Sequence, residues 1–128
     1  MSERIAITHA YLKAIERNES VEAFLAPDIE QIEFPNRLNP GGGKSDLAAM
    51  RDRNERGRGM VRQQRYDVVR AYEHGDTVIL EVGWRATFNI AVGTLQPGEA
   101  MKAHFAVFLD FEGDRIRRQR NYDCFEPF

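Results

Sequence analysis

The most regular pattern in the chain is an alternation of apolar and polar positions between residues 100 and 125. In residues 101–111, one face of an extended strand carries Met101, Ala103, Phe105, Val107, Leu109 and Phe111. Period-two alternation is typical of a strand, because successive side chains point to opposite faces. The other face, with Lys102, His104, Ala106, Phe108 and Asp110, is also apolar in its middle. We therefore expect a central strand with a lined cavity on one side and helices or a partner on the other.

Three further alternating runs accompany this strand. A turn centred on Gly113 leads into a return run, residues 115–125, which is more charged and is expected to lie nearer solvent. Upstream, Arg62–Tyr72 and Thr77 to about Val92 show the same period and are joined by a hairpin turn, EHGD, at Glu73–Asp76. The pattern predicts four consecutive antiparallel strands.

The first 35 residues show helical spacing followed by a short extended run. Ser2 is expected to cap a helix that ends near Asn18. Ser20 is expected to open a second, shorter helix, which Pro27 stops. A short strand is expected at residues 29–34.

The next segment is rich in glycine and proline, and it precedes a third helical pattern. Residues 36–43 are expected to form a loop that covers the mouth of a pocket. Ser45 is expected to cap a helix from Asp46 to about Arg56, which the glycines at 57 and 59 would end.

This order of elements predicts the fold class. Helices gathered first and a meander afterwards indicate an α+β domain, with the helices on one face of a strongly curved antiparallel sheet. Long strands coil, and a coiled sheet closed by helices makes a cone with an internal cavity. At 128 residues, the chain is expected to form one domain over residues 1–128.

Composition excludes several classes of partner. A net charge of −2 with 30% charged residues is typical of an ordinary soluble surface, so we expect neither nucleic acid nor membrane as a partner. The N-terminal segment has no uninterrupted apolar core. Cys124 has no second cysteine to pair with, which fits a cytoplasmic location. His9, His74 and His104 lack metal-ligand spacing, so no metal is expected.

Three local segments, in this order along the chain, resemble the SnoaL-like branch of the nuclear transport factor 2-like (ketosteroid isomerase-like) superfamily. They are YLKAIERNESVEAFLAPDIEQIEFP at 11–35, HFAVFLDFEGDRI at 104–116 and RQRNYDCFEPF at 118–128. The resemblance covers nearly the whole chain. It implies a cystatin-like α+β barrel with a deep pocket between sheet and helices. It also implies no cofactor, and commonly a homodimer formed through the outer sheet face.

The resemblance does not carry over the catalytic residues of two familiar enzymes. Tyr11 matches the oxyanion-donating tyrosine of ketosteroid isomerase, but Phe34 and about Ala106 stand where that enzyme has aspartates. The positions that match the two aspartates and the arginine of limonene epoxide hydrolase hold Trp84, Asn121 and Val82. The resemblance is therefore to the scaffold rather than to either chemistry.

The matched positions nevertheless give a set of candidate site residues. The catalytic candidates are His104, Tyr11 and Glu33. A tyrosine hydroxyl and an imidazole can polarise a carbonyl, and a carboxylate shielded by aromatic rings can exchange protons near neutral pH. The candidates for ligand binding are Trp84, Phe88, Phe108, Asn121 and Gln31.

A structural role is the alternative for each catalytic candidate. Tyr11 fits a core aromatic whose hydroxyl is satisfied, and His104 fits a partly buried strand residue bonded to a neighbour. A change of strand register by one residue would turn Glu33 to solvent. Asp123 fits either the pocket or an ion pair with Arg120.

Two functional hypotheses follow. The first is a small-molecule pocket protein that acts as a cofactor-free isomerase, cyclase, lyase or hydrolase on a hydrophobic substrate. The second is a non-catalytic homodimer on the same fold that binds a ligand or a protein partner.

Overall fold

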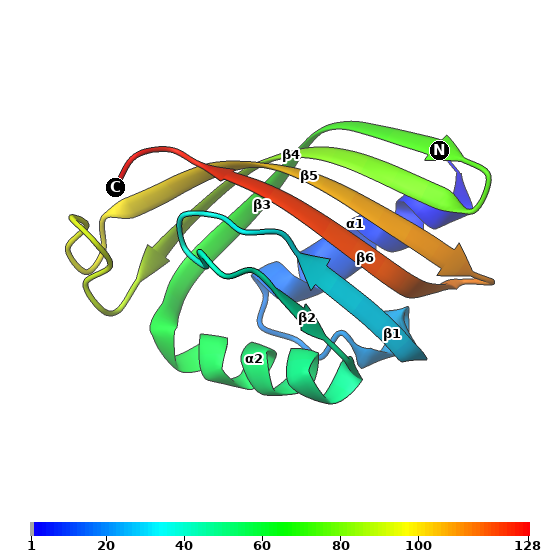
Figure 1. Cartoon of the computed structure of the whole chain (residues 1–128), viewed down its shortest axis with the longest axis horizontal. Helices are drawn as coiled ribbons and strands as arrows, with labels where there is room; N and C mark the ends of the chain where they lie inside the picture. Colours follow the sequence, from blue (N-terminus) through cyan, green and yellow to red (C-terminus); the bar gives the residue numbers. More distant parts are fainter. Residues whose placement is uncertain (1) are drawn as a thin grey trace.

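The structure, a computed structural model, describes residues 2–128, which form two α-helices, one 3-10 turn and six strands. In chain order these are α1 (Glu3–Glu16), η1 (Glu22–Phe24), β1 (Leu25–Glu33), β2 (Gly43–Ser45), α2 (Leu47–Met60), β3 (Val61–His74), β4 (Thr77–Phe88), β5 (Ala100–Glu112) and β6 (Arg115–Phe125). The strands form one sheet in the order β2-β1-β6-β5-β4-β3. Figure 1 shows this sheet arching over both helices.

The predicted α+β fold, with a curved sheet packed on helices, is confirmed. Strands β3 to β6 pair antiparallel in sequence, as the alternation predicts. One feature differs, because β1 runs parallel to β6 and the sheet is therefore mixed. A parallel pair needs a long connection, which the chain between β1 and β6 supplies.

Helix α1 begins where the sequence predicts. The Ser2 side chain accepts a hydrogen bond of 3.0 Å from the backbone N–H of Ile5, which satisfies one of the free donors of the first turn. After the helix, Asn18 adopts a φ of 56°, a left-handed conformation that suits asparagine at a helix end. Helix α1 packs against β3, and its buried residues are Thr8, Tyr11, Leu12 and Ala14.

The prediction of a second helix that opens at Ser20 is wrong. Only the 3-10 turn η1 forms there, and β1 begins directly after it, so Pro27 lies inside a strand instead of ending a helix. Proline is tolerated because the pairing of β1 with β6 shifts register between Leu25 and Glu30. An irregularity of this kind leaves positions at which no N–H is needed for the ladder.

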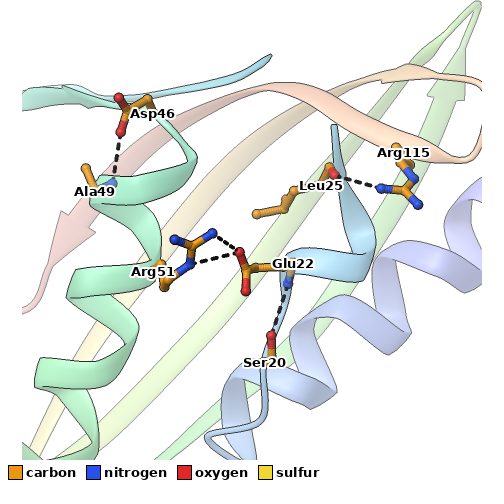
Figure 2. Close-up of polar contacts among 7 residues, drawn as sticks. All are labelled: Ser20, Glu22, Leu25, Asp46, Ala49, Arg51 and Arg115. Atoms are coloured by element: carbon orange, nitrogen blue, oxygen red, sulfur yellow. Dashed lines mark hydrogen bonds and ion pairs between the residues drawn. The ribbon is translucent and has the colours of Figure 1, made fainter. Parts of the chain in front are cut away.

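Helix α2 also departs from its predicted bounds. Asp46, rather than Ser45, is the N-cap, and its carboxylate accepts from the backbone N–H of Ala49 at 2.9 Å (Figure 2). Ser45 instead ends the short strand β2. The helix continues through Gly57 and Gly59 to Met60, because neither glycine takes the positive φ that would end it.

A side-chain contact ties α2 to the segment between α1 and β1. In Figure 2 the guanidinium of Arg51 reaches from α2 to Oε1 of Glu22 in η1, with an Nε–Oε1 distance of 2.9 Å. On the same segment, the hydroxyl of Ser20 accepts from the backbone N–H of Glu22 at 3.5 Å. The Arg51–Glu22 contact therefore links α2 to the turn that precedes β1.

The core lies between that concave face and the helices. The predicted apolar face of β5 is the inner one, and all six of its residues are buried. They pack with inner residues of β4, of which Val78, Leu80 and Val82 are almost fully buried. No helix formed by residues 2–128 has the length and apolar content needed to cross a membrane.

Candidate functional site

A cavity of about 300 Å³ lies between the inner sheet face and the helices. One wall is apolar and comes mainly from β3, β4 and β5, with Tyr66, Trp84, Phe105 and Val107. The adjoining wall is polar and comes from β1 and β6, with Gln31, Glu33, Gln119, Asn121 and Asp123. Tyr11 of α1 and Arg53 of α2 also line the cavity. The site therefore pairs an apolar surface with a stripe of polar groups.

Strand register explains why the polar stripe faces inward. Gln119, Asn121 and Asp123 pair with Leu109, Val107 and Phe105 of β5, which are all inner-face residues. On the other side, Gln31 of β1 lies opposite Gln119 and Glu33 lies opposite Asn121. Paired residues in neighbouring strands point to the same side of a sheet. The two strands therefore bring amide and carboxyl groups together on one face.

The amide groups of the polar wall form a continuous hydrogen-bond chain. The Tyr11 hydroxyl donates to Oε1 of Gln119 at 2.8 Å, and Nε2 of Gln119 donates to Oδ1 of Asn121 at 2.9 Å. From the other end, Arg53 donates to Oε1 of Gln31, whose Nε2 donates to the same Asn121 oxygen at 3.3 Å. The hydrogen bonds that start at Tyr11 and at Arg53 therefore both lead to Oδ1 of Asn121.

Tyr11 is held as a neutral donor. Its side chain is almost completely buried, and burial raises the pKa of the hydroxyl to about 12, although the charge of Arg53 and the bond to Gln119 oppose the shift. The phenol therefore keeps its proton at any physiological pH and cannot act as a base.

Asp123 adds a carboxyl group to the polar wall. Its Oδ1 atom is buried and has no hydrogen-bond partner within residues 2–128. Burial raises the pKa of the carboxyl to about 6, and the nearby charge of Glu33 adds to the rise. A carboxyl with such a pKa can both take up and release a proton near neutral pH.

Glu33 also lines the cavity, so its register does not turn it wholly to solvent. One of its carboxylate oxygens accepts from Nδ2 of Asn36 at 2.7 Å, while the side chain stays half-buried. Its negative charge is the second cause of the raised pKa of Asp123. Glu33 therefore lines the cavity and contributes to the raised pKa of Asp123.

The predicted placement of His104 in the pocket is wrong. His104 lies between Ala103 and Phe105, which both face the core, so the alternation of β5 turns it to the outer face. Its side chain is 72% exposed, and Nε2 lies 3.2 Å from a carboxylate oxygen of Glu126.

Phe108 and Phe88 are also not brought to the cavity. Phe108 lies on the outer face for the same reason as His104, and its ring packs edge-on against Tyr122 with centroids 5.6 Å apart. Phe88 is half-buried at the end of β4, where it packs against the core outside the cavity lining. The other candidates, Tyr11, Gln31, Glu33, Trp84 and Asn121, all line the cavity.

Asp123 is the residue that sequence reasoning undervalued. Its expected alternative partner, Arg120, lies on the outer face and pairs there with Asp110 at 2.5 Å. The sequence did contain a signal for its location. Asp123 lies two residues from Asn121 and four from Gln119 on one strand, so period-two alternation puts the three side chains on the same face. Phase would have placed Asp123 with the pocket residues.

These features define an α+β protein with a cavity between its curved sheet and its helices. Residues 9–119 match the family model of the SnoaL-like domain. The chain therefore belongs to the SnoaL-like family. Among curated proteins, none matches the chain.

Solved structures share the whole fold at low sequence identity. AclR from Streptomyces galilaeus, described as "a putative hydroxylase", has a TM-score of 0.79 at 20% identity, covering 99% of this chain and 82% of its own. IdmH from Streptomyces antibioticus, "a putative polyketide cyclase", has a TM-score of 0.76 at 15% identity, covering 95% and 92%. A Catenulispora acidiphila protein with a ketosteroid isomerase-like fold, in complex with trimethylamine, has a TM-score of 0.71 at 18% identity, covering 91% and 83%.

Proposed function

We propose that this protein is a cofactor-free acid–base enzyme that enolises a small, largely apolar carbonyl compound, with Asp123 as the base. The observation that carries the proposal is the buried, unpartnered Oδ1 atom of Asp123 in a cavity with an apolar wall. Asp123 lines the cavity, and no hydrogen bond within residues 2–128 competes for Oδ1, which supports a role for the carboxyl in taking a proton from a substrate C–H group. The raised pKa of Asp123 supports the same role, because such a carboxyl binds a proton readily yet is ionised at pH 7.

The step needs no further reactant. Asp123 takes a proton from the carbon beside the substrate carbonyl, the C–H electron pair forms a C=C bond, and the π pair of the carbonyl moves to its oxygen. If a C=C bond is conjugated with the enolate, return of the proton to the far carbon of that bond gives an isomer. Attack of the enolate carbon on a second carbonyl of the same substrate closes a ring, and the alkoxide formed takes the proton back from Asp123. Both outcomes use the same first step.

Asn121 is the proposed donor to the enolate oxygen. Its Oδ1 atom already accepts two hydrogen bonds, from Gln31 and Gln119, so its Nδ2 group is left to donate to a ligand. Asp123 lies two residues along the same face, about 6.5–7 Å away. With this spacing, a bound ketone can place its carbonyl oxygen near Nδ2 of Asn121 and the carbon beside its carbonyl near the carboxyl of Asp123. Tyr11 then acts indirectly, because its hydroxyl holds Gln119, which in turn donates to Asn121.

The relatives support a carbonyl substrate. IdmH and a protein from Acidithiobacillus ferrooxidans are each described as "a putative polyketide cyclase", the latter at 20% identity with a TM-score of 0.72. Polyketides combine repeated carbonyl groups with apolar carbon chains, which matches a cavity with one polar and one apolar wall.

The test is exchange of α-protons for deuterium in a benzo-fused cyclic ketone such as 2-tetralone, followed by NMR in D2O. The wild-type protein should accelerate exchange, and Asp123→Asn should lose roughly a hundredfold or more of that rate. His104→Ala is the matched control and should keep the full rate, because His104 lies on the outer face.

Binding can be followed separately. Trp84 is the only tryptophan in the sequence and lines the cavity, so its fluorescence reports occupancy. Ketones that quench Trp84 without any exchange above background would overturn the catalytic proposal and favour the non-catalytic, ligand-binding role.

We also propose that two copies associate through the outer sheet face. Phe34 and Tyr122 stack there with centroids 4.5 Å apart, and they remain 36% and 41% exposed. Covering such rings is favourable, and the family resemblance implies a dimer of this kind. Light scattering at micromolar concentration should give twice the chain mass, and Tyr122→Glu should halve it. A monomeric wild-type mass would contradict this proposal.

A further inference from the structure

We propose that Arg53 is a positioning residue that fixes the direction of the amide chain and thereby keeps Nδ2 of Asn121 turned toward the ligand. The effect on catalysis rests on the proposed function. The orientation itself can be tested without any substrate.

The direction of an amide chain is not determined by shape. The oxygen and nitrogen ends of Asn and Gln side chains are nearly the same size, so only their hydrogen-bond partners decide which end points where. Gln31, Asn121 and Gln119 are three such groups in a row. Their direction must therefore be set at one end of the chain.

Tyr11 cannot set it. A phenol hydroxyl either donates or accepts, so Tyr11 can serve a chain that runs in either direction. If all three amides turned over, Asn121 would donate to both glutamines and Gln119 would donate to Tyr11. Among Tyr11 and the three amides alone, the same three bonds would form in reverse, but Oδ1 of Asn121 would face the cavity. An enolate oxygen would then meet an acceptor instead of a donor.

Arg53 removes this ambiguity at the other end. A guanidinium has donors only, so Gln31 must offer Oε1 to Arg53 and is left to donate Nε2 to Asn121. Arg53 also donates to the Ser45 hydroxyl at 3.4 Å, which holds the guanidinium at the cavity rim. Since Arg53 is itself exposed, replacing it should leave the core intact.

The test compares three variants of the full chain labelled with 15N. Arg53→Met removes the donor, while Arg53→Lys keeps a group that can only donate. Arg51→Met is the matched control, because it frees α2 from Glu22 (Figure 2) without touching the amide chain. The readout is solvent exchange of the side-chain NH2 groups of Gln31 and Asn121, measured by NMR.

In the wild-type protein, the Gln31 NH2 group should be protected and that of Asn121 should exchange freely. Arg53→Met should speed exchange at Gln31 by roughly fivefold, which is the protection of an ordinary hydrogen bond, and should slow it at Asn121. Arg53→Lys and Arg51→Met should keep the wild-type pattern. An unchanged pattern in Arg53→Met, or the same change in Arg51→Met, would overturn the proposal.

Catalysis gives a second readout. Arg53→Met should slow 2-tetralone exchange by roughly tenfold, less than outright removal of an oxyanion donor, with Lys restoring the rate. Ketone affinity, read from Trp84 fluorescence, should change less than the rate. If the wild-type protein shows no exchange activity, the proposed function fails, while the NH2 pattern still decides the role of Arg53.

Discussion

Replacing Asp123 by asparagine should make the protein more stable at neutral pH while removing its proposed base. The reason is that the native state holds a carboxylate where burial disfavours the charge and where Oδ1 has no partner within residues 2–128. Asparagine has nearly the same shape but no charge. The site would then be one at which stability has been given up for reactivity.

The size of the effect follows from the pKa of Asp123. Burial, with the charge of Glu33, raises it from 3.8 to about 6. At about 1.4 kcal/mol per pH unit, this corresponds to about 3 kcal/mol of stability lost once the carboxyl is ionised in both states. Because the side chain is only partly buried, solvent screening reduces the figure, and we expect roughly 1–2 kcal/mol at pH 7.5.

The sign of the pH dependence is fixed by the direction of this shift. Since the pKa of Asp123 is higher in the folded state than in the unfolded chain, the folded state holds the proton more tightly between pH 3.8 and about pH 6. The contribution of Asp123 to stability is therefore fully present below 3.8 and is lost as the pH rises through about 6. The stability difference between Asp123→Asn and wild type should grow over this window and stay constant above it.

Urea unfolding of both proteins, at pH values from 3.5 to 8, measures this difference directly. Asp110→Asn is the matched control with the opposite sign. Burial raises the pKa of Asp110, but hydrogen bonds from Arg120 and Thr77 outweigh it, so that the pKa lies below its ordinary value. Asp110→Asn should therefore destabilise the protein at neutral pH. An Asp123→Asn variant that is no more stable than wild type at pH 7.5 would refute the reasoning.

Two further substitutions test the cavity wall and the loop beside it. Tyr11→Phe removes the hydroxyl that holds a buried glutamine, so urea unfolding should show a loss of roughly 1–2 kcal/mol, and an unchanged midpoint would contradict that bond. Gly42→Ala should lower the melting temperature, because φ is +62° and the added Cβ would lie 2.6 Å from the backbone oxygen of Glu33. Gly41→Ala, with open space around its Cβ, should melt like wild type; equal melting of both variants would count against the strain.

Local signals were sufficient for much of the fold. The alternation of residues 101–111 identified the inner face of β5, because period two depends only on neighbouring residues. The start of α1 was predictable for the same reason, since Ser2 caps a donor three residues away. By contrast, β1 is defined by pairing with a strand about 90 residues later, which no local pattern around Pro27 records.

Site residues were placed correctly where the matched position agrees with the phase of the strand, and wrongly where residue type was preferred to phase. Tyr11, Trp84 and Asn121 line the cavity as expected. His104 was placed there by its residue type and matched position, although the alternation of its own strand already set it opposite the buried face. Once one face of a strand is known to be core, the phase of each polar residue outweighs its chemistry as a predictor of location.

The polar wall depends on one irregularity that the sequence does not reveal. A plain period-two reading of β6 puts Arg118 and Arg120 on the same face as Ile116, which is fully buried. The pairing of β5 with β6 instead shifts by one residue, because Phe111 lies opposite Ile116 while Asp110 lies opposite Arg118. The extra residue resets the phase, as a β-bulge does. Ile116 therefore stays in the core while the amides and the carboxyl that follow face the cavity, and the arginines face outward.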